Sequence, residues 1–225
     1  MSILMNEKRA EEVAELLLSI QAASVQLDPP FTYTSGLRSP IYVDNRLILS
    51  FPEQRKRLME LYVESINEFI GVNKINAISG TATAAIPQAA FISALMNLPM
   101  VYARSSAKAH GKQKKLEGKL PENARVLIVE DHISTGGSAI DNASTVREEG
   151  GQVEFCIATS TYENPASEEA FKSYDIQLIV LTTGKIIVEK AHSKGIIDEK
   201  QKAMIDQWFE DPSGWYDEVF SKQQG

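Results

Sequence analysis

The residues with the clearest chemical potential lie in one short stretch, residues 126–138, which reads VLIVEDHISTGGS. Four apolar residues end abruptly in Glu130 and Asp131, and small or hydroxylated residues follow. Residues 134–138 offer three hydroxyls and successive backbone N–H groups, and their glycines let a ligand approach the backbone closely. At the start of a helix such a loop suits a phosphate, since the helix dipole adds ~0.3–1 kcal/mol for a negative group. The two acids would repel that phosphate unless they bind something else, such as sugar hydroxyls or a cation. A ribose phosphate meets both requirements, because its phosphate suits the loop and its sugar hydroxyls suit the acids.

Two other classes of phosphate site are excluded by what this stretch lacks. It has no lysine in a G-x-x-x-x-G-K-[ST] arrangement, which a P-loop requires, and no G-x-G-x-x-G of a dinucleotide-binding fold. A plain strand-to-helix turn without a ligand is the remaining alternative. The pair of acids directly before the loop argues against it.

A second stretch, residues 104–119, departs furthest from the acidic mean of the chain. It contains six Lys or Arg residues and a single acid, Glu117. Its glycines and its lack of apolar periodicity predict an exposed loop. We interpret Lys114, Lys115 and Lys119 as solvated surface charges without a further role.

A third stretch, residues 79–87, reads SGTATAAIP and follows an apolar run. Gly80 and Thr81 can present backbone N–H groups to an anion, as nests of successive amides do. A Gly-Thr turn before an Ala-rich helix is common, so this stretch alone is weak evidence for an anion site. Its place in the sequence before the other two stretches strengthens the interpretation.

Alternating strand and helix patterns must position these three stretches. Parallel strands with helices on both faces are the arrangement that such alternation favours, and ligands then gather beyond the carboxyl ends of the strands. We expect an amphipathic helix over residues 6–23, an irregular segment over 28–40, a short strand over 41–43 and a helix from Pro52 to about residue 70. The later pattern predicts strands over residues 75–79, 100–103, 126–129, 153–159 and 176–181, with helices over 83–97, 137–149 and 167–171. Residues 186–209 look helical, with a break at Gly195 and Asp198 as a new N-cap.

The composition of the whole chain narrows the class of protein. A length of 225 residues allows a substantial core, and the net charge of −7 argues against broad binding of nucleic acid or anionic membrane. Cys156 is the single cysteine, so no disulfide within the chain is expected. We see no export signal and no apolar run of the roughly 18 residues that a membrane span needs. These features favour the cytoplasm.

The stretch at residues 126–138 closely resembles the motif by which type I phosphoribosyltransferases bind phosphoribosyl pyrophosphate (PRPP). In that family an apolar run and paired acids precede a small-residue loop that holds the 5-phosphate. The resemblance implies that Glu130 and Asp131 contact the ribose hydroxyls, and that residues 79–87 form the pyrophosphate-binding turn. The implied PRPP contacts further include Gly80, Thr81, His132, Ile133, Ser134, Thr135, Gly136, Gly137 and Ser138.

The basic stretch resembles the catalytic lid of orotate phosphoribosyltransferases, which carries Arg, Lys and His at the spacing of Arg104, Lys108 and His110. In that family the lid closes over pyrophosphate and, in dimers, reaches into the site of the neighbouring subunit. Cations that engage departing pyrophosphate on closure stabilise the transition state more than the ground state. The resemblance therefore implies these three residues as catalytic and PRPP-binding residues, with Asp131 as a fourth catalytic residue.

Residues 31–46 separate members that use orotate from those that use purines. The sequence FTYTSGLRSP in this segment closely resembles the N-terminal signature of the orotate enzymes, within a hood over the base. Ser134 and Arg38 are the residues that we expect to contact orotate, with Arg46 or backbone N–H groups as alternatives for its carboxylate. His132 occupies an apolar-type position of the family loop, and we expect it to be variable rather than catalytic.

The chain departs from the family pattern in three places. Ser105 and Ser106 stand where many relatives have another lysine, which weakens turnover unless Lys112 substitutes. Thr34 stands where some relatives place a lysine before Ser-Gly. Some relatives carry an arginine after the strand that follows the PRPP helix, and residues 148–171 here contain neither Lys nor Arg.

The resemblance implies a type I phosphoribosyltransferase-like α/β fold, with a parallel sheet flanked by helices and a small N-terminal hood. We expect residues 1–50 to form the N-terminal helix and hood, 51–185 the α/β core and 186–225 a C-terminal helical extension. The implied reaction transfers ribose 5-phosphate from PRPP to orotate, with Mg²⁺ bound mainly through PRPP oxygens and water and no metal ligand from the chain. The implied assembly is a homodimer that shares its lid. A transferase for another base and a PRPP-sensing regulator without activity are the alternatives.

Overall fold

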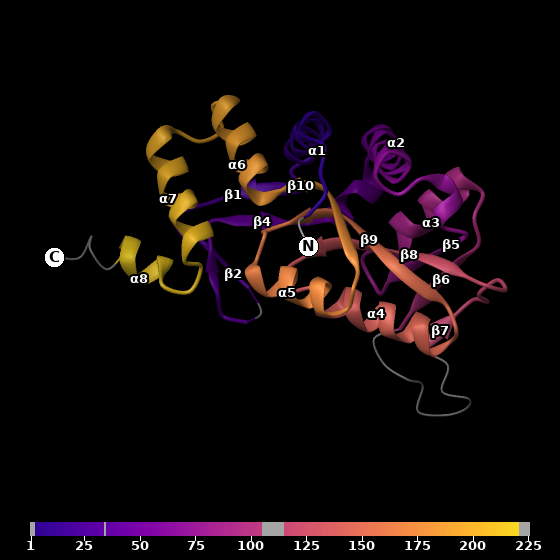
Figure 1. Cartoon of the computed structure of the whole chain (residues 1–225). Helices are drawn as coiled ribbons and strands as arrows, with labels where there is room; N and C mark the ends of the chain where they lie inside the picture. Colours follow the sequence, from indigo (N-terminus) through magenta and orange to yellow (C-terminus); the bar gives the residue numbers. More distant parts are fainter. Residues whose placement is uncertain (1–2, 34, 105–114, 221–225) are drawn as a thin grey trace.

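The computed structural model describes residues 3–33, 35–104 and 115–220 (Figure 1). Lys108 and His110, which the sequence predicts to be catalytic, lie outside these residues, as do Thr34, Ser105, Ser106 and Lys112. Among the helices of the described part, none combines the length and the apolar character that crossing a membrane requires.

A six-stranded sheet forms the centre of the molecule, in the order β10-β9-β8-β5-β6-β7. Neighbouring strands are parallel, except that β7 pairs antiparallel with β6 at the edge. The side chains alternate between the two faces, as a period of two requires: Leu127 and Val129 join one hydrophobic cluster, whereas Val126 and Ile128 join the other. The strands are β5 (Ala77–Thr81), β6 (Met100–Ala103), β7 (Leu116–Glu117), β8 (Arg125–Ile133), β9 (Gln152–Thr161) and β10 (Gln177–Thr183).

Helices cover both faces of this sheet. On one face lie α4 (Gly137–Glu148) and α5 (Pro165–Ser173), and on the other lie α1 (Glu7–Ser19), α2 (Pro52–Phe69), α3 (Ile86–Met96) and α6 (Gly184–Ser193) (Figure 1). The result is the three-layered α/β arrangement that the alternation of strand and helix patterns predicts.

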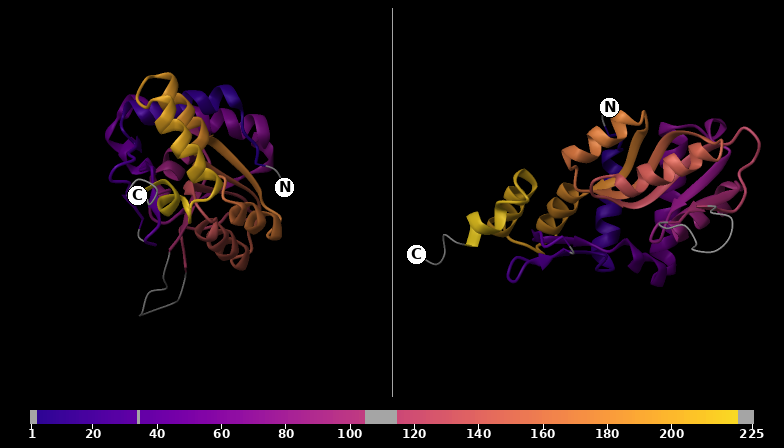
Figure 2. Two further views of the ribbon diagram at one scale, coloured as in Figure 1. Left: turned by 90° about the vertical axis from the view of Figure 1, so that its left-hand side faces the viewer. Right: turned by 90° about the horizontal axis from the view of Figure 1, so that it is seen from below.

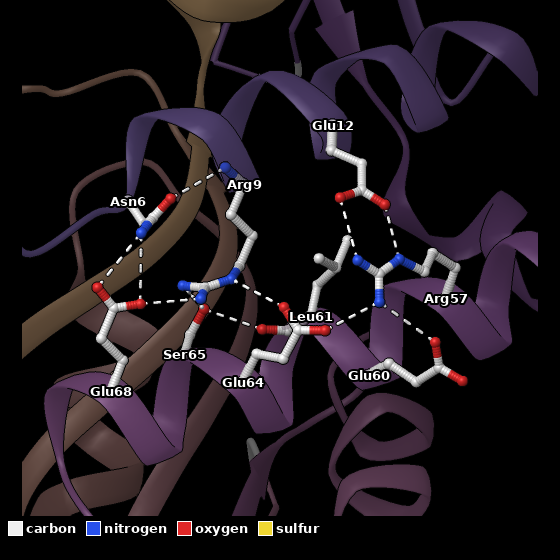
Figure 3. A network of polar contacts seen from close by, with 9 residues as sticks. All are labelled: Asn6, Arg9, Glu12, Arg57, Glu60, Leu61, Glu64, Ser65 and Glu68. Carbon is white, nitrogen blue, oxygen red and sulfur yellow. Dashed lines mark hydrogen bonds and ion pairs between the residues drawn. The ribbon is translucent and has the colours of Figure 1, made fainter.

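A network of polar side chains joins α1 to α2 (Figure 3). Arg9 donates to Ser65 at 3.0 Å and to Glu68 at 2.8 Å, and Arg57 holds Glu12 through two contacts of 2.6 and 3.1 Å. Each exposed pair stabilises the fold by only about 0–1 kcal/mol. Their geometry nevertheless fixes α1 against α2, which carries Tyr62 to the centre of the sheet.

The N-terminal segment and the C-terminal helices pack against each other at one end of the molecule (Figures 1 and 2). Two small antiparallel pairs form in the segment, β1 (Ala23–Val25) with β4 (Ile41–Val43) and β2 (Phe31–Thr32) with β3 (Arg38–Ser39), before the 3-10 helix η1 (Asn45–Ser50). The indole of Trp208 in α7 (Glu199–Glu210) donates to the carbonyl of Arg38 at 2.9 Å. The Arg38 guanidinium lies over the ring of Tyr216 in α8 (Trp215–Phe220), 5.3 Å from its centroid.

Several predicted elements are confirmed and some boundaries are wrong. Asp198 is the N-cap of α7, with a capping box that includes Gln201, as the sequence predicts. The helix expected over residues 6–23 ends at Ser19, because the chain turns and enters β1. The helix expected from residue 83 begins only at Ile86, since residues 82–85 form a turn after β5. The strands β1 and β7 were not predicted, nor was the β2–β3 pair within the expected irregular segment, whereas the strand expected over residues 41–43 is confirmed as β4.

Candidate active site

The phosphate-type loop lies at the carboxyl edge of the sheet, between β8 and α4. β8 ends at Ile133, and α4 begins at Gly137, so residues 134–136 form a tight link at a helix N-terminus. Gly136 has φ +84, and a Cβ atom there would lie 3.1 Å from the ring of Phe171. A non-glycine residue would therefore be strained and crowded at this position. A cavity of 220 Å³ lies over the loop and is lined by residues 130–139 and by residues 82–84 of the turn after β5.

A second cavity of 300 Å³ brings the other predicted stretches to the same edge. Thr81 at the end of β5, Arg104 from the start of the basic stretch and Ser138 from α4 all line it. Ala82 and Ser138 line both cavities, so the two are contiguous. The structure thus places Arg104 beside the turn and the loop, where the guanidinium pairs with Glu117 at 3.3 Å.

The paired acids at the end of β8 have different surroundings. The Glu130 side chain is buried, with 6% of the residue exposed, and accepts a hydrogen bond from the Asp131 backbone N–H at 3.0 Å. Burial, together with the adjacent Asp131 carboxylate, raises the pKa of Glu130 well above its usual range. At neutral pH the pair therefore carries less negative charge than two free carboxylates, which lowers its repulsion of an incoming phosphate.

Asn142 ties the turn to the loop, and the sequence gives no sign of this role. It is buried in α4, and its amide oxygen accepts from the Ser79 hydroxyl at 2.7 Å. Its amide nitrogen donates to the Thr81 hydroxyl at 3.0 Å. The helix that starts at the phosphate-type loop is thereby bonded directly to β5. Gly80 and Thr81, which the sequence predicts to form a turn, are the last two residues of that strand, and the turn follows at residues 82–85.

Two further residues, which the sequence did not single out, bond the backbone carbonyls of the two acids. The Tyr62 hydroxyl in α2 lies 2.6 Å from the Thr159 hydroxyl and donates toward the Glu130 carbonyl at 3.3 Å. Asn45, at the start of η1, donates to the Asp131 carbonyl at 2.7 Å. An aromatic residue in an amphipathic helix and an asparagine in a loop carry no sequence signal for such distant partners.

An aromatic group lies where the N-terminal strand pairs meet the central sheet. The ring of Tyr162, just after β9, contacts His132 and Trp208 edge-on, with centroids 4.4 and 5.4 Å apart. The Tyr162 and Tyr33 hydroxyls are 3.0 Å apart. The side chain of His132, which the sequence predicts to be variable rather than catalytic, lies 2.9 Å from the Ser160 hydroxyl.

The remaining predicted residues are placed as follows. Ser134 is exposed in the loop and lines the 220 Å³ cavity. Arg38 donates to the Thr32 hydroxyl at 2.7 Å within the hood and packs on Tyr216. Arg46 pairs with Asp44 at 2.6 Å. Cys156 is fully buried, as its interpretation as a core residue requires.

Several known proteins are similar to this chain in sequence or in structure. The orotate phosphoribosyltransferase of Coxiella burnetii is 44% identical over 209 residues, which cover 92% of this chain and 98% of that protein. The crystal structure of orotate phosphoribosyltransferase from Aeropyrum pernix matches with a TM-score of 0.71 and 26% identity, over 83% of this chain and 99% of that one. Leishmania donovani UMP synthase matches with a TM-score of 0.75 and 22% identity, and this chain spans 42% of that protein. No family model matches the chain.

Proposed function

Because this chain belongs to the orotate phosphoribosyltransferases, enzymes that transfer ribose 5-phosphate from PRPP to orotate, we propose how its own residues divide that work. The products are orotidine 5′-phosphate and pyrophosphate, in pyrimidine biosynthesis. The observation that carries the assignment of roles is the meeting of two cavities at Ala82 and Ser138. One cavity suits a ribose 5-phosphate, and the other is lined by Arg104 and Lys115, the described residues on either side of residues 105–114.

The 5-phosphate of PRPP binds the loop between β8 and α4. Successive backbone N–H groups and the hydroxyls of Ser134, Thr135 and Ser138 provide donors, and the start of α4 adds its dipole. The ribose hydroxyls bind Glu130 and Asp131. The full set of proposed PRPP contacts is Gly80, Thr81, Arg104, Lys108, His110, Glu130, Asp131, His132, Ile133, Ser134, Thr135, Gly136, Gly137 and Ser138, with His132 contributing through its backbone.

Pyrophosphate occupies the second cavity, between the end of β5 at Gly80 and Thr81 and the side chain of Arg104. As the bond from the ribose carbon to pyrophosphate breaks, negative charge grows on pyrophosphate and positive charge on the ribose. Arg104, Lys108 and His110 stabilise the former, and the Asp131 carboxylate stabilises the latter. The pyrimidine nitrogen of orotate then attacks the ribose carbon, so no covalent intermediate with the enzyme is needed.

Mg²⁺ is the proposed cofactor. Among the described residues, no group of three or more His, Cys, Asp or Glu side chains is placed to hold a metal ion. The acids at the carboxyl edge are Glu130, whose raised pKa keeps it largely protonated, and Asp131. This donor set fits an ion that takes most of its ligands from PRPP and water. When bound, the ion neutralises charge on the leaving pyrophosphate.

Orotate lies under the hood, beside the ribose. Ser134 and Arg38 are the proposed contacts, and Arg38 is held in the hood by Thr32 and Tyr216. We also propose that the enzyme is a cytoplasmic homodimer in which the lid of one subunit serves the site of the other. The single buried cysteine is compatible with a reducing compartment.

Orotate-dependent release of pyrophosphate from PRPP is the assay that tests this function. We expect turnover with orotate and little or none with hypoxanthine or uracil. Equal turnover with hypoxanthine would make the enzyme a transferase for another base. Tight PRPP binding without pyrophosphate release for any base would instead indicate a PRPP-sensing regulator.

A further inference from the structure

The side chain of His132 has one satisfied nitrogen and one that is not. Its Nδ1 atom lies 2.9 Å from the Ser160 hydroxyl, and its ring stands edge-on to Tyr162. Its Nε2 atom is shielded from solvent and has no hydrogen-bond partner among the described residues. Polar atoms shielded from solvent nearly always have a hydrogen-bond partner. We therefore expect Nε2 to find its partner in a bound ligand.

The neighbours of His132 determine which nitrogen carries the proton. The Asn45 amide nitrogen donates to the Asp131 carbonyl at 2.7 Å, and because a carbonyl only accepts, this contact fixes the orientation of the amide. The same nitrogen donates to the Ser160 hydroxyl oxygen at 3.1 Å. This leaves the single proton of Ser160 available for donation to Nδ1 of His132. With Nδ1 accepting that proton, the ring proton lies on Nε2, which is then a donor without an acceptor among the described residues.

His132 is also neutral under ordinary conditions. Burial lowers the pKa of its imidazole to about 4. The ring thus offers an N–H group rather than a positive charge. A neutral N–H group on a fixed ring can donate to an oxygen atom of a ligand, but it cannot accept from a ligand that is itself a proton donor.

The position of the ring favours the acceptor base over PRPP. The loop that we assign to the 5-phosphate runs away from His132 into α4, whereas the imidazole turns toward Ser160, Tyr162 and the hood. Tyr162 is itself linked to Tyr33 of the hood. Flat aromatic side chains at this junction suit a planar pyrimidine. Residues 148–171, which include this part of β9, contain no Lys or Arg, so this stretch itself supplies no cationic side chain to the base.

We propose that His132 is a specificity-determining residue whose Nε2–H donates a hydrogen bond to an oxygen of the acceptor pyrimidine. Asn45 and Ser160 are positioning residues, since they hold the ring and set its tautomer. The inference rests on the proposed function, because it needs a base to bind beside the ribose under the hood.

His132→Leu is the direct test, measured in the full-length enzyme with orotate and PRPP varied in turn. Loss of a hydrogen bond to an oxygen that carries charge corresponds to roughly a tenfold or larger change in binding. We expect the KM for orotate to rise by about that factor, with the KM for PRPP nearly unchanged. His132→Gln places an amide nitrogen near the position of Nε2 and should recover part of the loss.

Thr182→Val provides a matched control. Thr182 pairs in register with Ser160 on the adjacent strand, and its hydroxyl is another shielded atom without a partner among the described residues. Its replacement alters the same part of the sheet without touching the proposed donor. We expect both KM values to stay at the wild-type level.

The outcomes separate this inference from the function on which it rests. Wild-type enzyme without orotate turnover would overturn the proposed function and this inference with it. Active wild-type enzyme, together with an unchanged KM for orotate in His132→Leu, would overturn the inference alone. A rise in the KM for PRPP instead of orotate would assign Nε2 to the donor substrate and would also overturn it.

Discussion

The Asn142 amide donates to the Thr81 hydroxyl across 3.0 Å, and this contact joins two of the three stretches that meet at the active site. Thr81 ends β5, at the site proposed for pyrophosphate, and Asn142 lies in the helix that begins at the loop proposed for the 5-phosphate. The two ends of PRPP would therefore bind to elements that are bonded to each other. A fixed spacing of this kind holds the substrate in a reactive geometry without reorganisation.

Asn142→Ala should weaken both the fold and PRPP binding. The substitution leaves the buried hydroxyls of Ser79 and Thr81 without their partner, which costs about 1–3 kcal/mol of unfolding free energy. The KM for PRPP should rise because the turn loses its tie to α4. Urea denaturation and steady-state kinetics measure the two effects.

Ser65→Ala is the control for this prediction. Ser65 is a buried polar residue that bonds Arg9 and the Leu61 carbonyl, on α2 (Figure 3). Its loss should reduce stability and leave the KM for PRPP as it is. A parallel rise of this KM in both variants would mean that general loosening, rather than the Asn142 tie, sets PRPP affinity.

The sequence predicts the loop at residues 134–138 and its acids well, because a strand, a pair of carboxylates and a glycine-rich helix start form one local pattern. It also predicts the parallel sheet, since the order of periodic segments leaves few other arrangements. Arg104 lies near Thr81 because β5 and β6 are neighbours in the sheet. The order of the strands along the sequence does not by itself determine which strands are neighbours in the sheet.

The residues that sequence reasoning missed act over long distances in the chain. Asn45 bonds residues 131 and 160, and Tyr62 bonds residues 130 and 159. Neither has a local signature, because the role of each depends on how the hood and α2 pack on the sheet. His132 was assigned from its place in a motif, and only the three-dimensional arrangement reveals its Ser160 partner.

Acid should destabilise the wild-type protein through His132 before it affects most carboxylates. The folded-state pKa of about 4 lies below the unfolded value of about 6.5, so the unfolded chain binds this proton first. The stability contributed by neutral His132 is complete above pH ~6.5 and is lost as the pH falls toward 4. Between pH 8 and pH 5 the loss amounts to about 2 kcal/mol.

The comparison with His132→Leu isolates this effect. Glu130, whose raised pKa gives the opposite trend with pH, contributes to both proteins and cancels in their difference. Urea midpoints at pH 8, 6.5 and 5 should therefore converge or cross in favour of the variant as the pH falls. A difference in unfolding free energy that stays constant over this range would show that His132 is not held neutral by burial.

Lys108→Ala should reduce kcat strongly with little change in PRPP affinity. A donor that engages pyrophosphate mainly as it departs stabilises the transition state, and removing one such donor typically costs ~10²–10³ in kcat. Lys119→Ala, in the same basic stretch but assigned to solvent, should keep a near wild-type kcat. Loss of PRPP binding with unchanged kcat in Lys108→Ala would contradict the proposed role in the lid.

Shared active sites can be tested by mixing two inactive variants. Lys108→Ala removes the lid cation, and Asp131→Asn removes the carboxylate beside the ribose. If the lid of one subunit serves the other, a hybrid dimer contains one site with both groups intact and one with neither. Random exchange makes half of the dimers hybrid, so activity should recover to about a quarter of the wild-type value. Mass measurement of the mixture, with one variant tagged, establishes that hybrids have formed. Hybrids that form yet show no more activity than the separate variants would place Lys108 and Asp131 in the same subunit's site, with each subunit working alone.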